Sequence, residues 1–411
     1  PTRSLSPEKA TSNLWEKNRM AKLGDICFQI TDGSHNPPVG IGNSKHLMLS
    51  SKNVNDDEIT TTAPRFLTDE QFDLENKRTN VLSGDLLMTI VGTVGRVAIV
   101  PEALAGICLQ RSVAVIKPNP TIINNRYLMY QLRSMRKFLE SEARGVAQKG
   151  IYLKQVSDLS VIIPPLDEQY RVVDTLDRIS SLIHIYQQQL TKLDELVKAR
   201  FVEMFGDPIT NPKKWGVMEL GSLTEIGSSK RIFEKEYVSD GIPFYRTKEI
   251  VELSKGNPIS TELYITEKRF SEIKEQYGVP QKGDLLISAV GTIGVIWIVD
   301  GKKDFYFKDG NLIRVDSADR FNSTYMKTLL ENLIAEYKKQ MSSGTAYSAL
   351  TISGLTKMKI YDVPLSFQNQ FAAFVEEVDK SKLFVGSAVA HKPFDIEFFS
   401  KSTVQRPIKE V

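Results

Sequence analysis

Apolar residues recur at alternating intervals of four and three in the middle of the chain, which is the heptad pattern of a long amphipathic helix. No Gly or Pro occurs from Asp167 to Phe205, Gly206 suits a left-handed cap, and Pro208 prevents continuation. At ~1.5 Å per residue the helix forms a rod of about 60 Å. Such a rod needs a partner for its apolar seam, although a helix lying on its own domain is an alternative. The seam residues are Val172, Leu176, Ile179, Ile183, Tyr186, Leu190, Leu193 and Val197.

The chain contains an internal repeat on both sides of this helix. The segment Gly84–Gly95 returns as Gly283–Gly294, 199 residues later, and the same offset relates Gln169 to Gln368. A shared offset over more than eighty residues indicates duplication of one unit. We therefore expect two copies of a globular module, each followed by a helix.

Each module has the pattern of an α/β (α+β) domain with a strand-rich core. Residues 86–100 predict a strand, a Gly-containing turn and a second strand, and residues 112–117 predict another strand. Residues 127–141 have the apolar spacing of a helix. The second module repeats these patterns at residues 285–299, 311–315 and 325–340.

The second helix is expected to begin after Pro364 and to be shorter than the first, because Pro393 ends it early. Its carried-over seam includes one polar position, Lys382. The two helices can pack antiparallel as a coiled coil, which gives the chain a pseudo-two-fold axis. The seam positions are Phe371, Val375, Val378, Lys382, Val385 and Val389.

These patterns divide the chain into six segments. They are an N-terminal extension (1–21), a first globular module (22–163), a central helix (164–208), a second globular module (209–362), a shortened C-terminal helix (363–391) and a divergent tail (392–411).

Composition adds limits to this picture. The 411 residues carry a net charge of +3, which is too small to indicate nucleic-acid binding by itself. No apolar run is long enough to cross a membrane, the first residues lack an apolar signal core, and two cysteines cannot form a disulfide framework. We expect a cytoplasmic protein.

No motif assembles a catalytic or metal site. Gly92–Gly95 lacks the Lys-Ser/Thr of a phosphate loop and is expected to be a turn between strands. Asn36-Pro37-Pro38 is followed by Val39, where an amino-methyltransferase motif has an aromatic residue. Glu272-Ile273-Lys274 lies in a charged helical stretch. The histidines lack metal-ligand spacing. We expect no catalytic residue, metal or cofactor on this chain.

Basic, polar and aromatic residues recur in equivalent loops of the two modules, and this recurrence favours DNA binding, because Lys and Arg neutralise phosphates and Arg, Asn, Asp and Ser contact base edges. The candidates are Thr31, Asp32, Gly33, Ser34, His35, Lys52, Arg96, Arg111, Lys149 and Tyr152 in module one, and Lys230, Arg231, Phe233, Tyr245, Arg246, Lys248, Lys308 and Tyr347 in module two.

Four segments carry a resemblance to a known family: ITDGSHNPP at residues 30–38, PPLDEQ at 164–169, FVEMFGDP at 201–208 and GIPFYRTKEI at 241–250. With the repeated Gly-Asp-Leu-Leu element, they resemble the specificity subunit of Type I restriction-modification enzymes. The resemblance covers roughly residues 20 to 385.

The resemblance implies two domains that each read one half of a split double-stranded DNA target, with the helices fixing the gap. It also implies assembly with two modification (methyltransferase) subunits, which use S-adenosylmethionine, and with restriction subunits, which use ATP and Mg²⁺. A scaffold that does not touch DNA and a methyltransferase or nuclease fragment are the alternatives.

Overall fold

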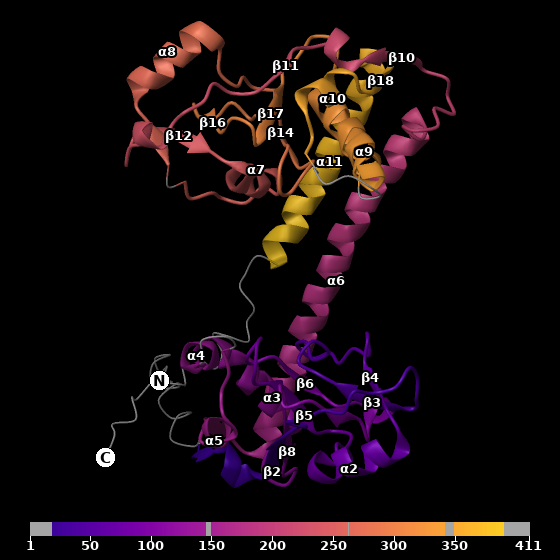
Figure 1. Ribbon diagram of the computed structural model, residues 1–411, viewed down its shortest axis with the longest axis vertical. Helices are drawn as coiled ribbons and strands as arrows, with labels where there is room; N and C mark the ends of the chain where they lie inside the picture. The colour runs from indigo at the N-terminus through magenta and orange to yellow at the C-terminus, as the bar shows by residue number, and fades with distance from the viewer. Residues whose placement is uncertain (1–18, 145–148, 262, 342–348, 390–411) are drawn as a thin grey trace, which may run out of the picture. The chain divides into compact units, whose positions relative to one another are not determined.

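The computed structural model describes residues 19–144, 149–261, 263–341 and 349–389. Two compact units form the chain, and the division between them falls between Tyr186 and Gln187, inside the long helix α6 (Leu166–Phe205) (Figure 1). The candidate residue Tyr347, the predicted tail and most of the predicted N-terminal extension lie outside the described residues.

The first unit contains three sheets. A four-stranded antiparallel sheet has the order β2-β8-β5-β6, and a three-stranded sheet has the order β4-β3-β7, in which β3 and β7 are parallel. The third sheet pairs β1 with β9. The strands are β1 (Arg19–Lys22), β2 (Cys27–Asp32), β3 (His46–Leu49), β4 (Arg65–Leu67), β5 (Leu86–Thr89), β6 (Val97–Ile99), β7 (Cys108–Leu109), β8 (Val113–Pro118) and β9 (Ser160–Ile163). Strand β1 thus begins three residues before the predicted start of the first domain, because its backbone pairs with β9.

The shorter helices of the first unit are α2 (Asp69–Thr79), α3 (Asn125–Ser134), α4 (Arg136–Glu142) and α5 (Leu153–Ser157), with the 3₁₀ turns η1 (Leu23–Ile26) and η2 (Glu102–Leu104). Residues of α3, α4 and α5 join the core cluster on one face of the four-stranded sheet, whereas Phe72 of α2 packs against the three-stranded sheet. Asn124 starts α3 by accepting hydrogen bonds from the backbone amides of Arg126 and Tyr127. The single helix predicted over 127–141 is instead two helices. The Ser134 hydroxyl donates to the Gln131 carbonyl just before the break at Met135, and such a bond competes with the helical pattern.

The second unit repeats this topology. Its sheets have the orders β11-β17-β14-β15, β13-β12-β16 (β12 and β16 parallel) and β10-β18. The strands are β10 (Gly216–Glu219), β11 (Ile226–Gly227), β12 (Ile242–Tyr245), β13 (Tyr264–Ile265), β14 (Leu285–Ser288), β15 (Ile296–Ile298), β16 (Tyr306–Phe307), β17 (Leu312–Val315) and β18 (Lys359–Asp362). The helices are η3 (Leu220–Ser222), η4 (Glu234–Glu236), α7 (Thr247–Ser254), α8 (Glu267–Tyr277), α9 (Ser323–Met341) and α10 (Ile352–Thr356). The predicted internal repeat is confirmed.

The central strands are buried on both faces. Leu86 and Met88 of β5 face the cluster that includes α3, whereas Leu87 between them joins a separate cluster with Leu49 and Leu109. This alternation follows from the two-residue period of a strand. Continuous apolar runs such as Leu-Leu-Met therefore mark strands with a core on each side, and β14 repeats the arrangement.

The heptad seam of α6 serves different partners along its length. Val172 and Leu176 pack into the core of the first unit, and Val197 packs into the core of the second. The residues between them are half-buried. The predicted pairing of the two seams is confirmed at the end of α6, because Val197 packs into the cluster that contains Phe371 and Val375 of the second long helix. At the start of α6 the core of the first unit covers the seam. Gly206 adopts φ 82° and its amide bonds the Val202 carbonyl at 2.8 Å, which confirms the predicted cap.

The second long helix, α11 (Leu365–Val389), has 25 described residues against 40 in α6. Within the second unit it runs antiparallel to the end of α6: Phe371 contacts the ring of Phe201, and Lys382 further along α11 pairs with Asp194, earlier on α6, at 2.8 Å. The antiparallel pair is confirmed, and the one polar seam position, Lys382, is satisfied by an ion pair.

A buried glutamine fastens the start of each long helix to its own module. The Gln169 side chain accepts from the amide of Asn124 at 2.7 Å and donates to the carbonyls of Ile122 (3.0 Å) and Pro164 (2.8 Å). Gln368 repeats this in the second unit, where it accepts from the Asn322 amide at 2.8 Å. Both side chains are almost fully buried. The repeat thus extends to individual hydrogen bonds.

Replacing Gln169 with Ala should lower the free energy of unfolding of the first unit by about 2–4 kcal/mol, because three backbone groups lose the buried side chain that bonds them. Urea denaturation of the full chain measures this. The matched control is Gln187→Ala at an exposed position of α6, which should change stability by less than about 0.5 kcal/mol. Equal midpoints for the two variants would show that the buried amide contributes nothing.

Candidate nucleic-acid interface

The loops that carry the candidate residues meet at one edge of each unit. In the first unit β2 and β5 end, and β6 and β8 begin, at the same edge of the antiparallel sheet. The parallel strands β3 and β7 also end there, since β7 leads directly into β8. The second unit repeats this with β11, β12, β14 and β16. We call these loops, at the carboxyl ends of these strands, the loop edge of each unit.

The structure brings the ten candidates of module one to this loop edge. Thr31 and Asp32 end β2 and lead into Gly33, Ser34 and His35. The Arg111 amide donates to the Ser34 carbonyl at 2.9 Å. Lys52 follows β3, Arg96 precedes β6, and the carbonyl of Lys149 accepts from Gly92 at 3.0 Å, with Tyr152 close behind in sequence.

Three of these side chains are free to meet a ligand. Lys52, Arg111 and Lys149 are exposed, and none forms an ion pair or side-chain hydrogen bond with the residues that the structure describes. Tyr152 exposes 72% of its surface beside them. A cluster of unpaired cations with an exposed aromatic ring suits a phosphate backbone.

Three other candidates, Asp32, Gly33 and His35, are used within the loop itself. The Asp32 carboxylate is buried, and it pairs with the guanidinium of Arg78 and with Nε2 of His35 at 2.8 Å. A Cβ at Gly33 would lie 2.1 Å from the carbonyl oxygen of Leu109, so only glycine fits there. These residues therefore shape the loop.

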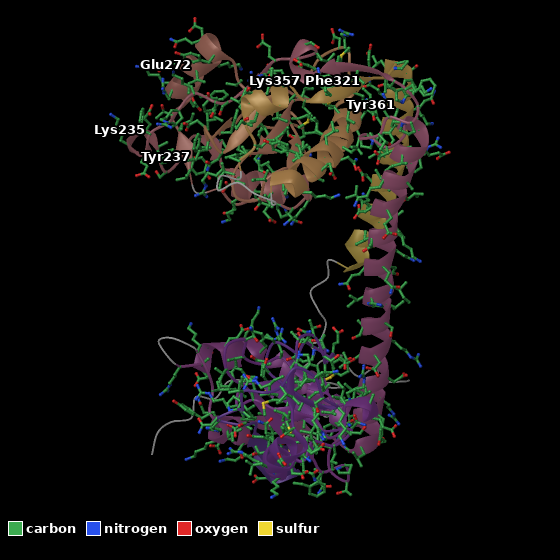
Figure 2. The ribbon with its side chains drawn as sticks, turned by 45° about the vertical axis from the view of Figure 1, so that its right-hand side comes forward. Lys235, Tyr237, Glu272, Phe321, Lys357 and Tyr361 are labelled. Atoms are coloured by element: carbon green, nitrogen blue, oxygen red, sulfur yellow. The ribbon has the colours of Figure 1, made fainter. Side chains whose placement is uncertain are left out.

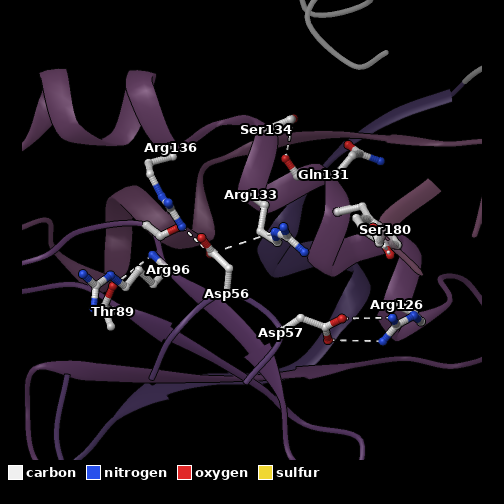
Figure 3. A network of polar contacts seen from close by, with 12 residues as sticks. Asp56, Asp57, Thr89, Arg96, Arg126, Gln131, Arg133, Ser134, Arg136 and Ser180 are labelled. Carbon is white, nitrogen blue, oxygen red and sulfur yellow. Dashed lines mark hydrogen bonds and ion pairs between the residues drawn. The ribbon is translucent and has the colours of Figure 1, made fainter. Parts of the chain in front are cut away.

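Arg96 belongs to a polar network that extends from the loop after β3 to α6 (Figure 3). Its guanidinium donates to Asn55 at 3.3 Å. The adjacent Asp57 receives two bonds from Arg126, whose Nε also pairs with Asp177 of α6 at 2.6 Å. Asp56 pairs in the same way with residues Arg133 and Arg136.

Tyr130 completes this network at the helix. Its hydroxyl donates to Asp177 at 2.6 Å. Burial and this hydrogen bond raise the pKa of Tyr130 to about 12, so the phenol stays protonated and keeps donating. The network therefore ties the loop after β3 to the first half of α6.

The candidate side chains at the loop edge of module two also divide into those that are bonded within the protein and those that are free. Arg231 pairs with Asp309 at 2.8 Å, and the Lys230 ammonium lies 4.9 Å from the ring centre of Tyr277. Lys248 and Lys308 form no side-chain hydrogen bond or ion pair with any described residue. Phe233, which is exposed, also lies after β11. The free cations at this edge are thus Lys248 and Lys308.

Arg246 is held by a buried carboxylate. Glu249 exposes only 1% of its surface, accepts from the Arg246 amide at 2.9 Å and pairs with its guanidinium at 2.9 Å. Burial raises the pKa of Glu249, but the hydrogen bonds and the charge of Arg246 lower it by more, so the pKa lies below its ordinary value. This arrangement fixes the turn that presents Lys248.

Module one builds the same turn with a neutral residue. The buried Asn53 side chain accepts from the Ser50 amide at 3.0 Å, so Ser50 and Asn53 correspond to Arg246 and Glu249. Lys52 then corresponds to Lys248. The equivalence inferred from sequence for these lysines is supported by a shared backbone geometry.

A hollow of about 490 Å³ opens beside Lys52. Its lining residues are Val39, Ile41, Met48, Ser50, Lys52, Asn53, Ala63, Pro64, Arg65, Phe66 and Gln110. Val39 exposes 96% of its surface at the end of the Asn-Pro-Pro segment. Sequence reasoning missed Gln110, although it named Lys308, which occupies the equivalent place after β16.

The motifs that were set aside as structural behave as expected. Gly92 and Gly95, at φ 83° and 84°, form a turn between β5 and β6, and no helix follows it. Glu272 lies on α8 and pairs with Arg269 at 3.4 Å (Figure 2). Across the described ranges there is no cluster of three or more metal-ligating side chains and no helix both long and apolar enough for a membrane span.

Comparisons with known proteins agree with this architecture. The family model described as "Type I restriction modification DNA specificity domain" matches residues 42–195 and again 212–384. A Haemophilus influenzae protein named as a type I restriction enzyme specificity subunit is 29% identical over 67% of this chain and 69% of its own length. The EcoBI specificity subunit of Escherichia coli is 28% identical over 44% of this chain and 39% of its own.

Solved structures share the fold. The S subunit of the Type I restriction-modification system from M. genitalium superposes with a TM-score of 0.51 at 14% identity, over 90% of this chain and 92% of that one. A chain solved in work on the assembly and conformational transition of a type I R-M system gives 0.54 at 17% identity, over 98% and 97%. Both likenesses concern the fold alone.

Arg246→Ala should lower the free energy of unfolding of the second unit by about 2 kcal/mol, because it leaves the buried Glu249 carboxylate without its charged partner. The neighbouring control, Lys248→Ala, should change it by less than about 0.5 kcal/mol. Urea denaturation measures both.

Because the pKa of Glu249 is lowered on folding, the stability from this pair is present above the ordinary glutamate pKa. It is lost as the pH falls through the folded value, so the difference between wild type and Arg246→Ala should shrink in acid. A difference that grows in acid contradicts this account.

Proposed function

The chain belongs to the Type I restriction modification DNA specificity domain family, and from this premise we propose that it is the DNA-reading subunit of a Type I restriction-modification complex. Each unit reads one half of a split, asymmetric double-stranded target. The observation that carries the proposal is the repeated loop edge, on which a free lysine, Lys52 or Lys248, occupies the same position in each unit while the neighbouring side chains differ.

The free lysines and arginine supply the affinity. Lys52, Arg111 and Lys149 lie on loops of one unit, and Lys248 lies in the first turn of α7 in the other. None of these four side chains forms an ion pair with a residue that the structure describes. Contacts from such groups to phosphates fix the register of a protein on a duplex without reading sequence. The loop residues that differ between the units then explain two unlike half-sites.

The helix α6 supplies the spacing. It is unbroken over 40 residues and contributes its first half to one unit and its second half to the other. Two readers must engage DNA at matching helical phase, which recurs every ~34 Å. We infer that the length of α6 sets the gap between the half-sites.

Chemistry belongs to the partners in this proposal. The repeated units offer two near-equivalent surfaces, which suits two copies of one modification (methyltransferase) subunit. Those subunits bind S-adenosylmethionine, and restriction subunits bind ATP and Mg²⁺, while this chain binds neither. Such a complex acts on DNA in the cytoplasm. A gel shift by the assembled complex that persists without this chain would overturn the proposal in favour of an assembly scaffold.

The double substitution Lys52→Ala, Lys248→Ala should weaken binding of the assembled complex to its target at least tenfold without altering base preference in either half-site. Removing two phosphate contacts reduces the magnitude of the slope of log association constant against log salt concentration by about 2. The measurement is a salt titration of binding. Substituting Lys255 and Lys302, which are both paired with acidic neighbours, is the control and should leave the slope unchanged. An unchanged slope for the double variant contradicts its role.

Inserting four residues between Gln187 and Gln189 should lengthen the tolerated gap by about two base pairs, since four residues add ~6 Å of helix and each base pair rises ~3.4 Å. The half-sites themselves should not change. Sequencing the methylated sites in a host that expresses the variant with its partners measures both properties. A gap that stays fixed rules out the spacer role of α6.

A further inference from the structure

Gln110 and Lys308 occupy one equivalent position in the two units. Gln110 directly follows β7, and its amide donates to the Leu49 carbonyl at 2.9 Å. Lys308 directly follows β16, and its amide donates to the Tyr245 carbonyl at 2.9 Å. The main chain is therefore held by the same bond in both loop edges, while the side chains are chemically different.

The backbone of Gln110 is fixed but its side chain is not. Its carbonyl accepts from Val113 at 3.0 Å, so both of its backbone groups are bonded. Its amide side chain forms no hydrogen bond with any residue that the structure describes, and it lines the 490 Å³ hollow with Lys52 and Ser50. A rigid anchor with an uncommitted polar end is the arrangement that a specific contact requires.

Glutamines with structural roles in this chain look different. Gln131 donates to the Ile162 carbonyl at 2.7 Å and accepts from the Ile162 amide at 2.8 Å. Gln169 and Gln368 also bond backbone groups in both senses. Gln110 is half-buried yet bonds nothing with its side chain. A packing role therefore does not account for it.

We propose that this position reads a base in each half-site, with Gln110 selecting adenine in the first and Lys308 selecting guanine in the second. A glutamine amide both donates and accepts, which matches N6 and N7 of adenine. A lysine only donates, which matches O6 and N7 of guanine. The inference rests on the proposed function, because it assigns a role within the same DNA-reading surface.

Two cationic side chains near Gln110 are placed to contact phosphates. Arg111 is exposed and unpaired among described residues, and its backbone is bonded to the loop after β2. Lys52 lines the same hollow as Gln110. Two cations that flank a free amide can hold the phosphates while the amide reaches the base edge.

The test exchanges the two side chains. Full-length Gln110→Lys and Lys308→Gln chains, each assembled with the modification subunits, are used to select from a double-stranded DNA library of random sequence. The Gln110→Lys complex should prefer guanine instead of adenine at one position of the first half-site, with a change in relative affinity of about tenfold. Its preference in the second half-site should be unchanged. Lys308→Gln should produce the opposite change in the second half-site.

Three variants make the outcome decisive. Gln110→Ala should lose about tenfold discrimination at the same position without gaining guanine. Arg111→Gln should weaken binding to all sequences alike, and Gln187→Lys, the same substitution on exposed α6, should leave the preference unchanged. Unaltered preference in Gln110→Lys and Gln110→Ala complexes overturns the base-reading role while the proposed function stands. Selection of the same sequences by complexes without this chain overturns the proposed function itself.

Discussion

A single buried amide at the start of each long helix is the constraint on which the rest of the structure depends. Gln169 and Gln368 join three backbone segments in each unit: the helix start, the strand before it and the loop before α3 or α9. An unpaired backbone group at such a place is costly, so the amide permits only one arrangement. The helix start is thereby fixed to the strands whose opposite ends form the loop edge.

The two units keep this shared attachment but stabilise the surrounding helix in different ways. In the first unit, Arg126 and Tyr130 of α3 bond Asp177 of α6. The caps Asn124 and Asn322 align α3 with α9, and threonines then stand at the positions of Arg126 and Tyr130. In their place the second unit has an aromatic cluster of Phe201, Phe205, Tyr325 and Phe371. Duplication preserved the backbone plan and allowed the contacts to diverge.

Much of the fold was predictable because it depends on local sequence. The repeat at a constant offset, the Gly92–Gly95 turn, the strands that precede it and the Gly206 cap all follow from short-range patterns. The split use of the α6 seam did not, since a heptad pattern states which face is apolar and not what covers it. Val172 and Val197 are identical in pattern but enter different cores.

The sequence predicted where the candidate residues lie, but not which of their side chains are bonded within the protein. Sequence position placed Lys52, Arg111 and Lys248 near the two loop edges. It could not separate them from Asp32, whose partner Arg78 is far away in sequence, or from Arg246, whose partner Glu249 is buried. Gln110 was missed because a neutral amide gives no charge signal.

The separation between bonded and free charges has a physical cause. A loop that presents a side chain to DNA must hold its own backbone still, or the contact loses more in ordering entropy than it gains. Asn53 and Glu249 provide that rigidity because their side chains accept hydrogen bonds from the backbone amides of Ser50 and Arg246. A buried glutamate needs a cation nearby, so Arg246 is committed to it, whereas the neutral Asn53 needs none. The acidic anchor of the second unit therefore uses an arginine that a sequence pattern assigns to DNA, whereas the neighbouring Lys248 forms no ion pair with a described residue.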